Sequence, residues 1–522
     1  MSEPLASYAT GRWHTAPDVR TAGVPVADAV TGEEVTRVSS AGLDMGAVLD
    51  HAHSVGGPAL RALTFHQRAA LLKALAGHLR EHRREFYALS YRTGATLSDS
   101  KFDVDGGIGV LSAYAAIGAR ELPDDTVLAL DEPQPLGRGS TFAGQHLAVS
   151  RLGAAVQINA YNFPVWGMLE KLAPALLAGA PSIVKPATVT SYLTALVVRE
   201  IVGSGILPEG ALQLVCGSTG DLLDRLGPQD SVAFTGSAET GRRLRSHPSV
   251  VAEAIRFTAE ADSLNCSILG PDAIPGTPEF DLYVDQLVTE MTVKAGQKCT
   301  AIRRALVPAD RVDAVLDAVR GRLEEVVVGN PSSEGVTMGA LAGLDQRDDV
   351  RAAVDALARA GRIVSADPDK VDPVDADPER GAFMTPVLLH GDPDRAEPHD
   401  VEAFGPVSTV LAYDTVADAL ALAARGRGSL AASVVTADGT VARQVVHGLA
   451  PWHGRVLVLD RDCAAESTGH GSPLPGLLHG GPGRAGGGAE LGGLDSMHHH
   501  LQRSAVQGGP AVLAATRTGE LA

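Results

Sequence analysis

The chain has 522 residues, with 62 acidic against 44 basic side chains and a formal net charge of −18. Its length suggests about two to four domains, which can bury a large core without disulfides. Apolar residues make up 45% and charged residues 20%, which is typical of globular proteins. The acidic balance argues against nucleic-acid binding and disfavours docking on anionic lipid.

Four cysteines are present, and no two of them have CxxC spacing: Cys216, Cys266, Cys299 and Cys463. We therefore expect no disulfide framework and a cytoplasmic location. The first residues, MSEPLASYATGRWHT, lack a basic patch followed by an apolar stretch. No apolar run of about 18 residues occurs, so we expect neither a signal peptide nor a membrane span.

Residues 1–60 are predicted to form short turns and strands. Apolar residues at a helical period predict a helix over Thr64–Tyr91, with Leu72, Leu75 and Leu79 on its buried face. The proline-rich and aspartate-rich stretch 121–145 is predicted to be an excursion from the main body.

From residue 148 the sequence alternates between strand-like and helix-like segments. The strand-like segments are LAVSRLGAAVQIN, PSIVKP, ALQLVCG and SVAFTGS. One helix is WGMLEKLAPALLAGA, in which Pro174 should weaken or kink the helix. Another carries Leu193, Val197 and Ile201 on one face. This alternation predicts a parallel sheet covered by helices, with ligands beyond the carboxyl ends of its strands.

A second apolar-periodic region spans 264–460, with helices expected near 281–294 and 311–326 and strands at RALVP, LAASVVT and VLVLD. The glycine-rich HGGPGRAGGG at 479–488 is either a flexible linker or an ordered loop, and we favour the loop. The run His498–His500 has no acidic or cysteine partner at ligand spacing, so we expect a solvated segment and no metal site.

Cys299 lies in AGQKCTAIRR, where a glycine turn could expose it at a helix start. Positive charge from Lys298, Arg303 and Arg304 would favour the reactive thiolate. The alternative is a buried structural cysteine. Glu260 ends the strand-like IRFTAE and is either a general base near the ligand crevice or a solvated acid.

The segment FTGS at 234–237, followed by Gly241, indicates a strand, a tight turn and a helix start. Such a turn presents free backbone N–H groups to an anion, although glycine turns precede many helices. Lys185 follows the apolar strand PSIV. It can hold a phosphate or a ribose, or it can be an ordinary surface lysine.

Five ordered motifs together resemble the aldehyde dehydrogenase superfamily: YNFPVW at 161–166, KPA at 185–187, FTGS at 234–237, GQKC at 296–299 and EAFGP at 402–406. The resemblance spans at least 150–410. It implies an α/β fold of three parts. These are a Rossmann-like NAD(P)-binding domain (1–120 and 149–263), an α/β catalytic domain (264–465) and a small β oligomerisation segment with the tail (121–148 and 466–522). A homodimer or dimer-based oligomer is expected.

Further motifs resemble one branch of the superfamily: EADSLN at 260–265, MTVKAGQKCTAIRR at 291–304, STGHGSPLP at 467–475 and HGGPGRAGGG at 479–488. That branch is the aldehyde dehydrogenase module of the bacterial phenylacetate ring-opening enzyme, and the benzoyl-CoA pathway's semialdehyde dehydrogenase is its near relative. The module is commonly fused to an enoyl-CoA-hydratase-like domain. The chain ends soon after LQRSAVQGG, so we expect the hydratase to be a separate protein.

The resemblance implies oxidation of a CoA-linked semialdehyde to the acid. EKLAP at 170–174 and SPLP at 472–475 favour the 3-oxo-5,6-dehydrosuberyl-CoA semialdehyde type. The alternatives are a 3,4-dehydroadipyl-CoA semialdehyde dehydrogenase, a CoA-acylating aldehyde dehydrogenase, and a binding protein on the same scaffold. Arg303, Arg304 and Arg484 are candidate contacts for CoA.

By the same resemblance, Cys299 is the nucleophile, and Asn162 donates to the oxyanion together with the Cys299 backbone N–H. Glu260 activates the hydrolytic water. The family often has two glycines after this glutamate, where this chain has Ala-Asp, so Glu253 is the alternative base.

The resemblance also assigns the cofactor site: Lys185, Thr188, Gly236, Ser237, Gly241, Glu402 and Phe404. NAD-preferring members often have a glutamate at the position of Thr188, and its carboxylate would repel a 2′-phosphate. Threonine predicts that NADP is preferred over NAD.

Overall fold

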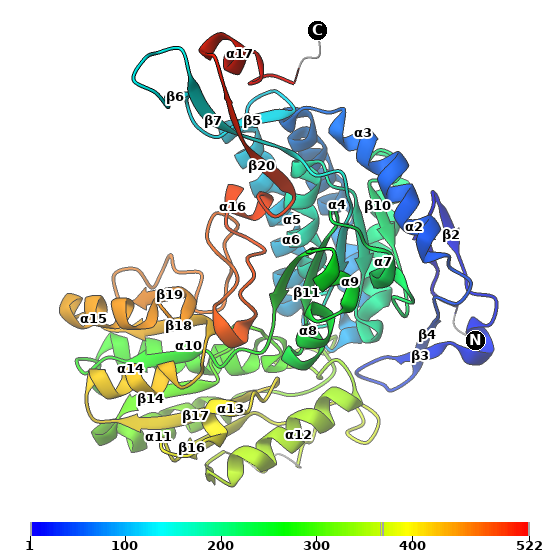
Figure 1. Ribbon diagram of the computed structural model, residues 1–522. Coiled ribbons are helices and arrows are strands. Elements are labelled where there is room, and N and C mark those ends of the chain that lie inside the picture. Colours follow the sequence, from blue (N-terminus) through cyan, green and yellow to red (C-terminus); the bar gives the residue numbers. More distant parts are fainter. Residues whose placement is uncertain (1–2, 366, 368–369, 520–522) are drawn as a thin grey trace.

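The computed structural model describes residues 3–365, 367 and 370–519. Within them, two seven-stranded sheets and one smaller sheet organise the chain (Figure 1). The first sheet has the order β12-β11-β8-β9-β10-β1-β2. Its parallel strands are β8 (Ala155–Ile158), β9 (Ser182–Lys185), β10 (Leu212–Leu214), β11 (Ser231–Thr235) and β12 (Arg256–Glu260). The antiparallel strands β1 (Ser7–Ala9) and β2 (Arg12–His14) complete it.

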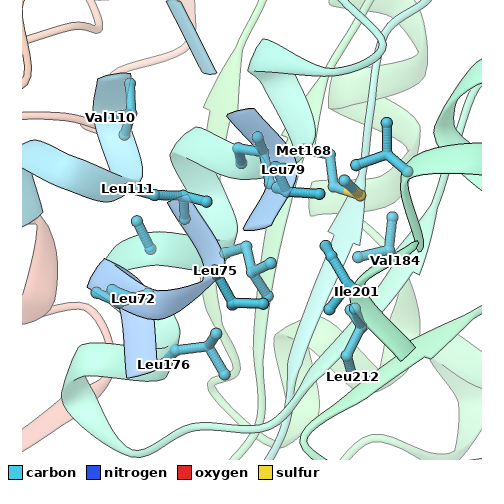
Figure 2. Packing of buried hydrophobic residues seen from close by; sticks show 14 of the residues in the cluster. Leu72, Leu75, Leu79, Val110, Leu111, Met168, Leu176, Val184, Ile201 and Leu212 are labelled. Atoms are coloured by element: carbon cyan, nitrogen blue, oxygen red, sulfur yellow. The ribbon is translucent and has the colours of Figure 1, made fainter. Parts of the chain in front are cut away.

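Four helices pack together against this sheet: α4 (Phe65–Ser90), α5 (Leu97–Glu121), α6 (Trp166–Ala178) and α7 (Ser191–Gly203). The helix predicted over 64–91 is confirmed as α4, which begins after a capping box between Thr64 and Gln67. Leu72, Leu75 and Leu79 are fully buried in the cluster that joins these helices to the sheet (Figure 2).

The first 60 residues contain more helix than expected. They include α1 (Val19–Ala22), α2 (Met45–His51), the π-helical turn Ala52–Gly56 and α3 (Gly57–Arg61), besides the hairpin of β3 (Val24–Ala27) and β4 (Glu34–Val38). Asp44 caps α2 by accepting from the N–H groups of Gly46 and Ala47. This cap is a signal that the sequence analysis missed.

Helix α5 was also missed, because it contains several glycines, which lower helix propensity. The structure gives a packing reason for two of them. A Cβ at Gly106 would lie 1.9 Å from the Trp166 ring, and one at Gly107 would lie 3.0 Å from the Trp166 Cα. The glycines therefore let α5 approach the start of α6 closely. Helix α6 runs through Pro174 without interruption, so the prediction of that helix is confirmed.

The second sheet has the order β15-β16-β17-β14-β13-β18-β19. Its strands are β13 (Cys266–Leu269), β14 (Arg304–Pro308), β15 (Gly361–Ile363), β16 (Val387–Gly391), β17 (Val407–Tyr413), β18 (Ser429–Val435) and β19 (His453–Leu459). All pairs are parallel except that of β15. The predicted strands RALVP, LAASVVT and VLVLD correspond to β14, β18 and β19.

Helices cover this second sheet: α10 (Pro278–Thr292), α11 (Val312–Leu323), α12 (Leu344–Ala358), α14 (Val416–Ala424) and α15 (Gly439–Leu449). Helices α10 and α11 confirm those expected near 281–294 and 311–326. The short α13 (Glu397–Asp400) precedes β17.

The third sheet stands away from the two larger ones, at the top of Figure 1. It joins β5 (Val127–Ala129), β6 (Gln134–Pro135) and β7 (Ala143–Ser150) to the distant β20 (Leu501–Gly508). Strands β7 and β20 pair antiparallel along their whole length. The turn-rich stretch and the tail therefore meet in one arm, followed by α17 (Pro510–Ala515).

The glycine-rich segment 479–488 is an ordered loop that packs on β12, as predicted. Four of its glycines have positive φ, and a Cβ at Gly488 would lie 2.0 Å from Thr258 Oγ1. The expectation that the histidine run is solvated is wrong for His500, which is buried and whose pKa is lowered by burial. Among the described helices, none is long and apolar enough to cross a membrane.

Candidate functional site

A small cavity of about 40 Å³ lies at the carboxyl ends of β8, β11 and β12. Residues from the first sheet, from helices α5 and α6, from the loop before β14 and from the tail line it. They include Phe102, Asn162, Phe163, Trp166, Glu170, Lys171, Glu260, Cys299, Pro473 and His479. The structure thus brings the predicted nucleophile, the predicted base and the predicted oxyanion donor to one cavity.

Cys299 is positioned by an unusual backbone. Lys294, Ala295 and Gly296 are consecutive residues with φ of 56°, 50° and 67°, in the left-handed region. A Cβ at Gly296 would lie 2.1 Å from the carbonyl oxygen of Gly405, so glycine is required there. This segment delivers Cys299 into a loop, not to the helix start that we expected.

Hydrogen bonds fix the Cys299 backbone on one side only. Its carbonyl accepts from Asn265 Nδ2 at 2.9 Å. Its N–H donates no hydrogen bond within the described part of the chain, so this donor is free to serve a ligand. Asn162 Nδ2 donates to the Gln297 carbonyl at 2.9 Å, and the amide has a second N–H to offer.

Lys298 favours the Cys299 thiolate, as expected, but burial and the charge of Glu260 outweigh it. Lys298 Nζ lies 2.7 Å from Glu290 Oε1, and Arg303 donates to the carbonyls of Gly405 and Gly296. Burial, together with the charge of Glu260, raises the pKa of the Cys299 thiol well above its usual value. Burial and the charge of Glu260 therefore favour the thiol over the thiolate.

Arg303 and Arg304 also do not face a substrate. Arg304 is fully buried and donates to the carbonyls of Leu264, Leu422 and Ala423. Arg484 donates to the carbonyl of Asp400 at 2.7 Å. These contacts occupy the guanidinium groups of Arg303 and Arg304, so our assignment of these two residues as CoA contacts is wrong.

Glu260 is 2% exposed at the end of β12, and its Oε2 lies 3.0 Å from His479 Nε2. One ligand-type atom each from Glu260, Cys299 and His479 lies within 4.8 Å of the others. Burial by itself would raise the Glu260 pKa, but His479 and Lys171 outweigh it and lower the pKa below its usual value. Glu260 is therefore ionised at neutral pH. Glu253, the alternative base, is exposed after α9 (Pro248–Ala252).

The sequence analysis missed a buried charged cluster beside Glu260. Lys171 Nζ lies 3.0 Å from Glu490 Oε2 and 3.7 Å from Glu170 Oε1. Burial raises the Glu170 pKa well above its usual value, so this carboxyl holds a proton. The residues of this cluster belong to EKLAP and to the region of the glycine-rich loop. The sequence motifs there had served only to indicate the branch.

The cofactor residues gather at the carboxyl edge of the first sheet. Lys185 ends β9, and Thr188 begins the 3-10 turn Thr188–Thr190. Ser237 caps α8 (Ala238–Arg245) by accepting from the Thr240 N–H. The Ala238 N–H donates to Asp262 Oδ1 at 2.8 Å. Part of the predicted anion site is therefore already capped by the protein.

Glycine and unpaired polar atoms leave room for a dinucleotide. A Cβ at Gly236 would lie 2.7 Å from the Phe234 ring, and one at Gly241 would lie 3.2 Å from it. Glu402 Oε1 and both amide atoms of Asn159 are buried without a hydrogen-bond partner among the described residues. Buried polar atoms normally have partners, so these donors and acceptors fit the hydroxyls and amide of a nicotinamide nucleotide.

Burial raises the pKa of Glu402 to about 7, despite the charge of Arg303. Phe404 packs edge-on against Tyr161, with ring centroids 6.0 Å apart, and Arg303 lies over the Phe404 ring. Asn159, at the end of β8, is a cofactor candidate that the sequence analysis missed. Its only signal was its place after a strand.

Comparison with known proteins identifies the family. Residues 13–502 match the Aldehyde dehydrogenase family. The 3,4-dehydroadipyl-CoA semialdehyde dehydrogenase of Aromatoleum evansii is 48% identical over 490 residues, which cover 92% of this chain and 93% of that protein. Protein MaoC of Klebsiella aerogenes is 51% identical over 181 residues, which cover 34% of this chain and 52% of that protein.

Solved structures share the fold. PnpE from Pseudomonas sp. WBC-3 matches with a TM-score of 0.83 and 22% identity, covering 100% of this chain and 99% of that one. Betaine aldehyde dehydrogenase from Staphylococcus aureus, in complex with NAD+, matches with a TM-score of 0.83 and 24% identity, covering 99% and 95%. The chain therefore belongs to the aldehyde dehydrogenase family and is an NAD(P)-dependent oxidoreductase.

Proposed function

We propose that this enzyme oxidises the aldehyde of a CoA-linked semialdehyde and releases the product as a carboxylic acid. The observation that carries the proposal is the shared cavity of Cys299, Glu260 and Asn162, next to a free Cys299 N–H. The whole-length similarity to the Aromatoleum evansii enzyme supports a CoA-linked substrate.

In the first step, the Cys299 sulfur attacks the aldehyde carbon and the thiol proton passes to Glu260. The carbonyl electrons move to oxygen, where Asn162 and the Cys299 N–H donate hydrogen bonds to the new negative charge. One such donor typically contributes about 3–4 kcal/mol to the transition state. In the resting site, the negative charge of Glu260 disfavours the thiolate. The proton transfer removes that charge.

A bound nicotinamide cofactor supplies the hydride acceptor when the thiohemiacetal collapses to a thioester on Cys299. Lys185, Ser237 and Glu402 would hold that cofactor, and Phe404 would pack against it. We infer that NADP is preferred over NAD, because Thr188 presents no carboxylate to a 2′-phosphate.

Before the last step, Glu260 releases the thiol proton to solvent. It then takes a proton from water as the water oxygen attacks the thioester carbon. The C–S bond breaks, and the leaving sulfur takes this proton back from Glu260, which restores the thiol. His479 lies 3.0 Å from Glu260 and favours its ionised form. A carboxylate that is ionised at neutral pH is the form that this step needs.

Two substrates are in competition. The similarity to the Aromatoleum evansii enzyme spans nearly both chains and favours the six-carbon 3,4-dehydroadipyl-CoA semialdehyde. EKLAP and SPLP favour the eight-carbon 3-oxo-5,6-dehydrosuberyl-CoA semialdehyde of aerobic phenylacetate degradation. The latter role includes a separate enoyl-CoA-hydratase-like partner.

The deciding experiment follows absorbance at 340 nm with both CoA-linked semialdehydes and with simple aldehydes, using NADP and NAD. We expect the highest kcat/KM with one CoA-linked substrate and NADP. Higher kcat/KM with NAD contradicts the interpretation of Thr188. Preference for simple aldehydes contradicts the substrate class. Turnover that requires added free CoA, and persists in Glu260→Gln, would indicate a CoA-acylating enzyme.

We also propose a cytoplasmic homodimer, or an oligomer built from it, that uses the third sheet. Strand β20 lies at an edge of that sheet and exposes several residues along its length. A long exposed edge strand is a common site for pairing with a second chain. Light scattering on the wild type and on a chain lacking 500–522 tests this, because loss of β20 should give a monomer.

A further inference from the structure

A second hollow, of about 600 Å³, lies outside the described site. It is formed between the last turns of α4 and the first turns of α5, which pack side by side (Figure 1). Three cations and two aromatic residues line it, together with one acid: Arg83, Arg84, Lys101, Tyr87, Tyr91 and Asp105. We call it the α4–α5 groove.

The cations of this groove lack partners among the described residues. Among the described residues, Arg83, Arg84 and Lys101 form no hydrogen bond or ion pair, and all three are exposed. Asp105 also lines the groove and accepts from the Tyr87 hydroxyl at 2.6 Å, so three cations face one carboxylate there. Three unpaired positive charges around one hollow, on a protein of net charge −18, form a local anion-binding surface.

Helix α5 connects the groove to the active site. Phe102 lines the cavity of Cys299, and its neighbour Lys101 lines the groove. Successive helical residues point about 100° apart, so the two hollows lie on adjacent faces of α5. Phe102 also packs against Trp166, at a ring-centroid distance of 5.3 Å, beside the cavity. A long flexible ligand can therefore occupy both hollows by passing Phe102.

We propose that the α4–α5 groove binds the phosphorylated adenosine of the CoA carried by the substrate, while the aldehyde reaches Cys299. This inference rests on the proposed function. Arginines bind phosphate oxygens through paired donors, and a phosphate monoester carries a charge of about −1.5 to −2 at neutral pH. Tyr91 offers an accessible ring against which adenine can stack. The thioester arm bridges the two hollows.

The test compares two substrates that share the same semialdehyde, one as the CoA thioester and one as the N-acetylcysteamine thioester, which lacks the nucleotide. The triple variant Arg83→Ala/Arg84→Ala/Lys101→Ala should raise KM for the CoA thioester by about tenfold. Its kcat, and both constants for the short thioester, should stay unchanged. Added salt should reduce the wild-type preference for the CoA thioester.

Two matched variants serve as controls. Arg443→Ala removes an exposed charge on the distant α15 and should leave kcat and KM unchanged for both thioesters. The charge-preserving Arg83→Lys/Arg84→Lys should recover most of the CoA preference. Binding of adenosine 3′,5′-bisphosphate at saturating NADP, measured by calorimetry, should occur in the wild type and weaken in the triple variant.

The outcomes separate the two proposals. A wild type with equal kcat/KM for the two thioesters contradicts the proposed CoA-linked substrate. A wild type that prefers CoA, together with a triple variant that keeps this preference, overturns the groove alone. An equal loss of kcat/KM for both thioesters in the triple variant also overturns the groove proposal. The three residues would then support the fold and not bind the nucleotide.

Discussion

Two carboxylates of the proposed site, Glu260 and Glu402, differ in their surroundings. Glu260, on the aldehyde side, is surrounded by His479 and Lys171, which lower its pKa. Glu402, on the cofactor side, has an unpartnered oxygen and a pKa raised to about 7 by burial. Glu260 therefore has charged neighbours within the protein, whereas Glu402 has an oxygen without a hydrogen-bond partner among the described residues. The predictions below test this difference.

The largest effect is expected from Cys299→Ala, which removes the nucleophile. Dehydrogenase activity should fall by about 10³-fold or more, because no other described thiol lines the cavity. Cofactor affinity, measured by fluorescence quenching, should stay near the wild-type value. Cys463→Ala, at an exposed position, is the control and should leave activity unchanged. Full activity in Cys299→Ala would show that the chemistry lies elsewhere.

Glu260→Gln should lower steady-state turnover by about 10²–10⁴-fold, because the base is lost. Rapid mixing should show a slow burst of cofactor reduction at neutral pH. The burst should speed up as the pH rises, because the Cys299 thiol ionises more readily without the charge of Glu260, while steady-state turnover stays low. Recovery of both phases at high pH would contradict a role for Glu260 in hydrolysis.

His479→Ala should act through the pKa of Glu260. In the wild type the folded-state pKa of Glu260 is lowered, so ionised Glu260 persists as the pH falls. Without His479, burial should raise that pKa, and the acid limb of the kcat profile should move to higher pH by about one unit or more. His498→Ala, an exposed histidine of the same tail, is the control. An unshifted acid limb would assign His479 a packing role only.

The smallest effect concerns Glu402 and the ligand-free protein. The folded-state pKa of Glu402 is about 7, above the reference value of 4.5. The stability that Glu402 contributes is therefore present at low pH and is lost as the pH rises through 7. Glu402→Gln carries no charge to bury. Between about pH 5 and 8, the wild-type Tm should fall by about 1–2 °C more than that of the variant. Saturating NADP should remove the difference, and parallel Tm curves without NADP would contradict the assignment.

Some features of the molecule could be predicted from the sequence, and others could not. Local patterns sufficed for α4, whose leucines recur at the helical period, whereas the roles of Cys299 and Glu402 were predicted from the resemblance to a family. Contacts between distant segments have no local signal. His479 reaches Glu260 only because the glycine-rich loop packs on β12, and nothing near either residue encodes that distance.

Charge near a residue in the sequence was a poor guide to charge near it in space. Arg303 and Arg304 follow Cys299 closely, yet their guanidinium groups satisfy buried carbonyls. Buried backbone carbonyls need donors, and an arginine supplies several at once. Helix α5 was missed because its glycines oppose helix formation, although they are what allows close packing against Trp166.

The pairing of β7 with β20 has a consequence for the biosynthesis of the chain. Strand β7 leaves the ribosome long before β20, since all of the second sheet lies between them in the sequence. Until the tail emerges, β7 keeps an open edge that can pair with other nascent chains. The third sheet is therefore completed last. An oligomer that needs β20 can form only from chains in which the second sheet has already been translated.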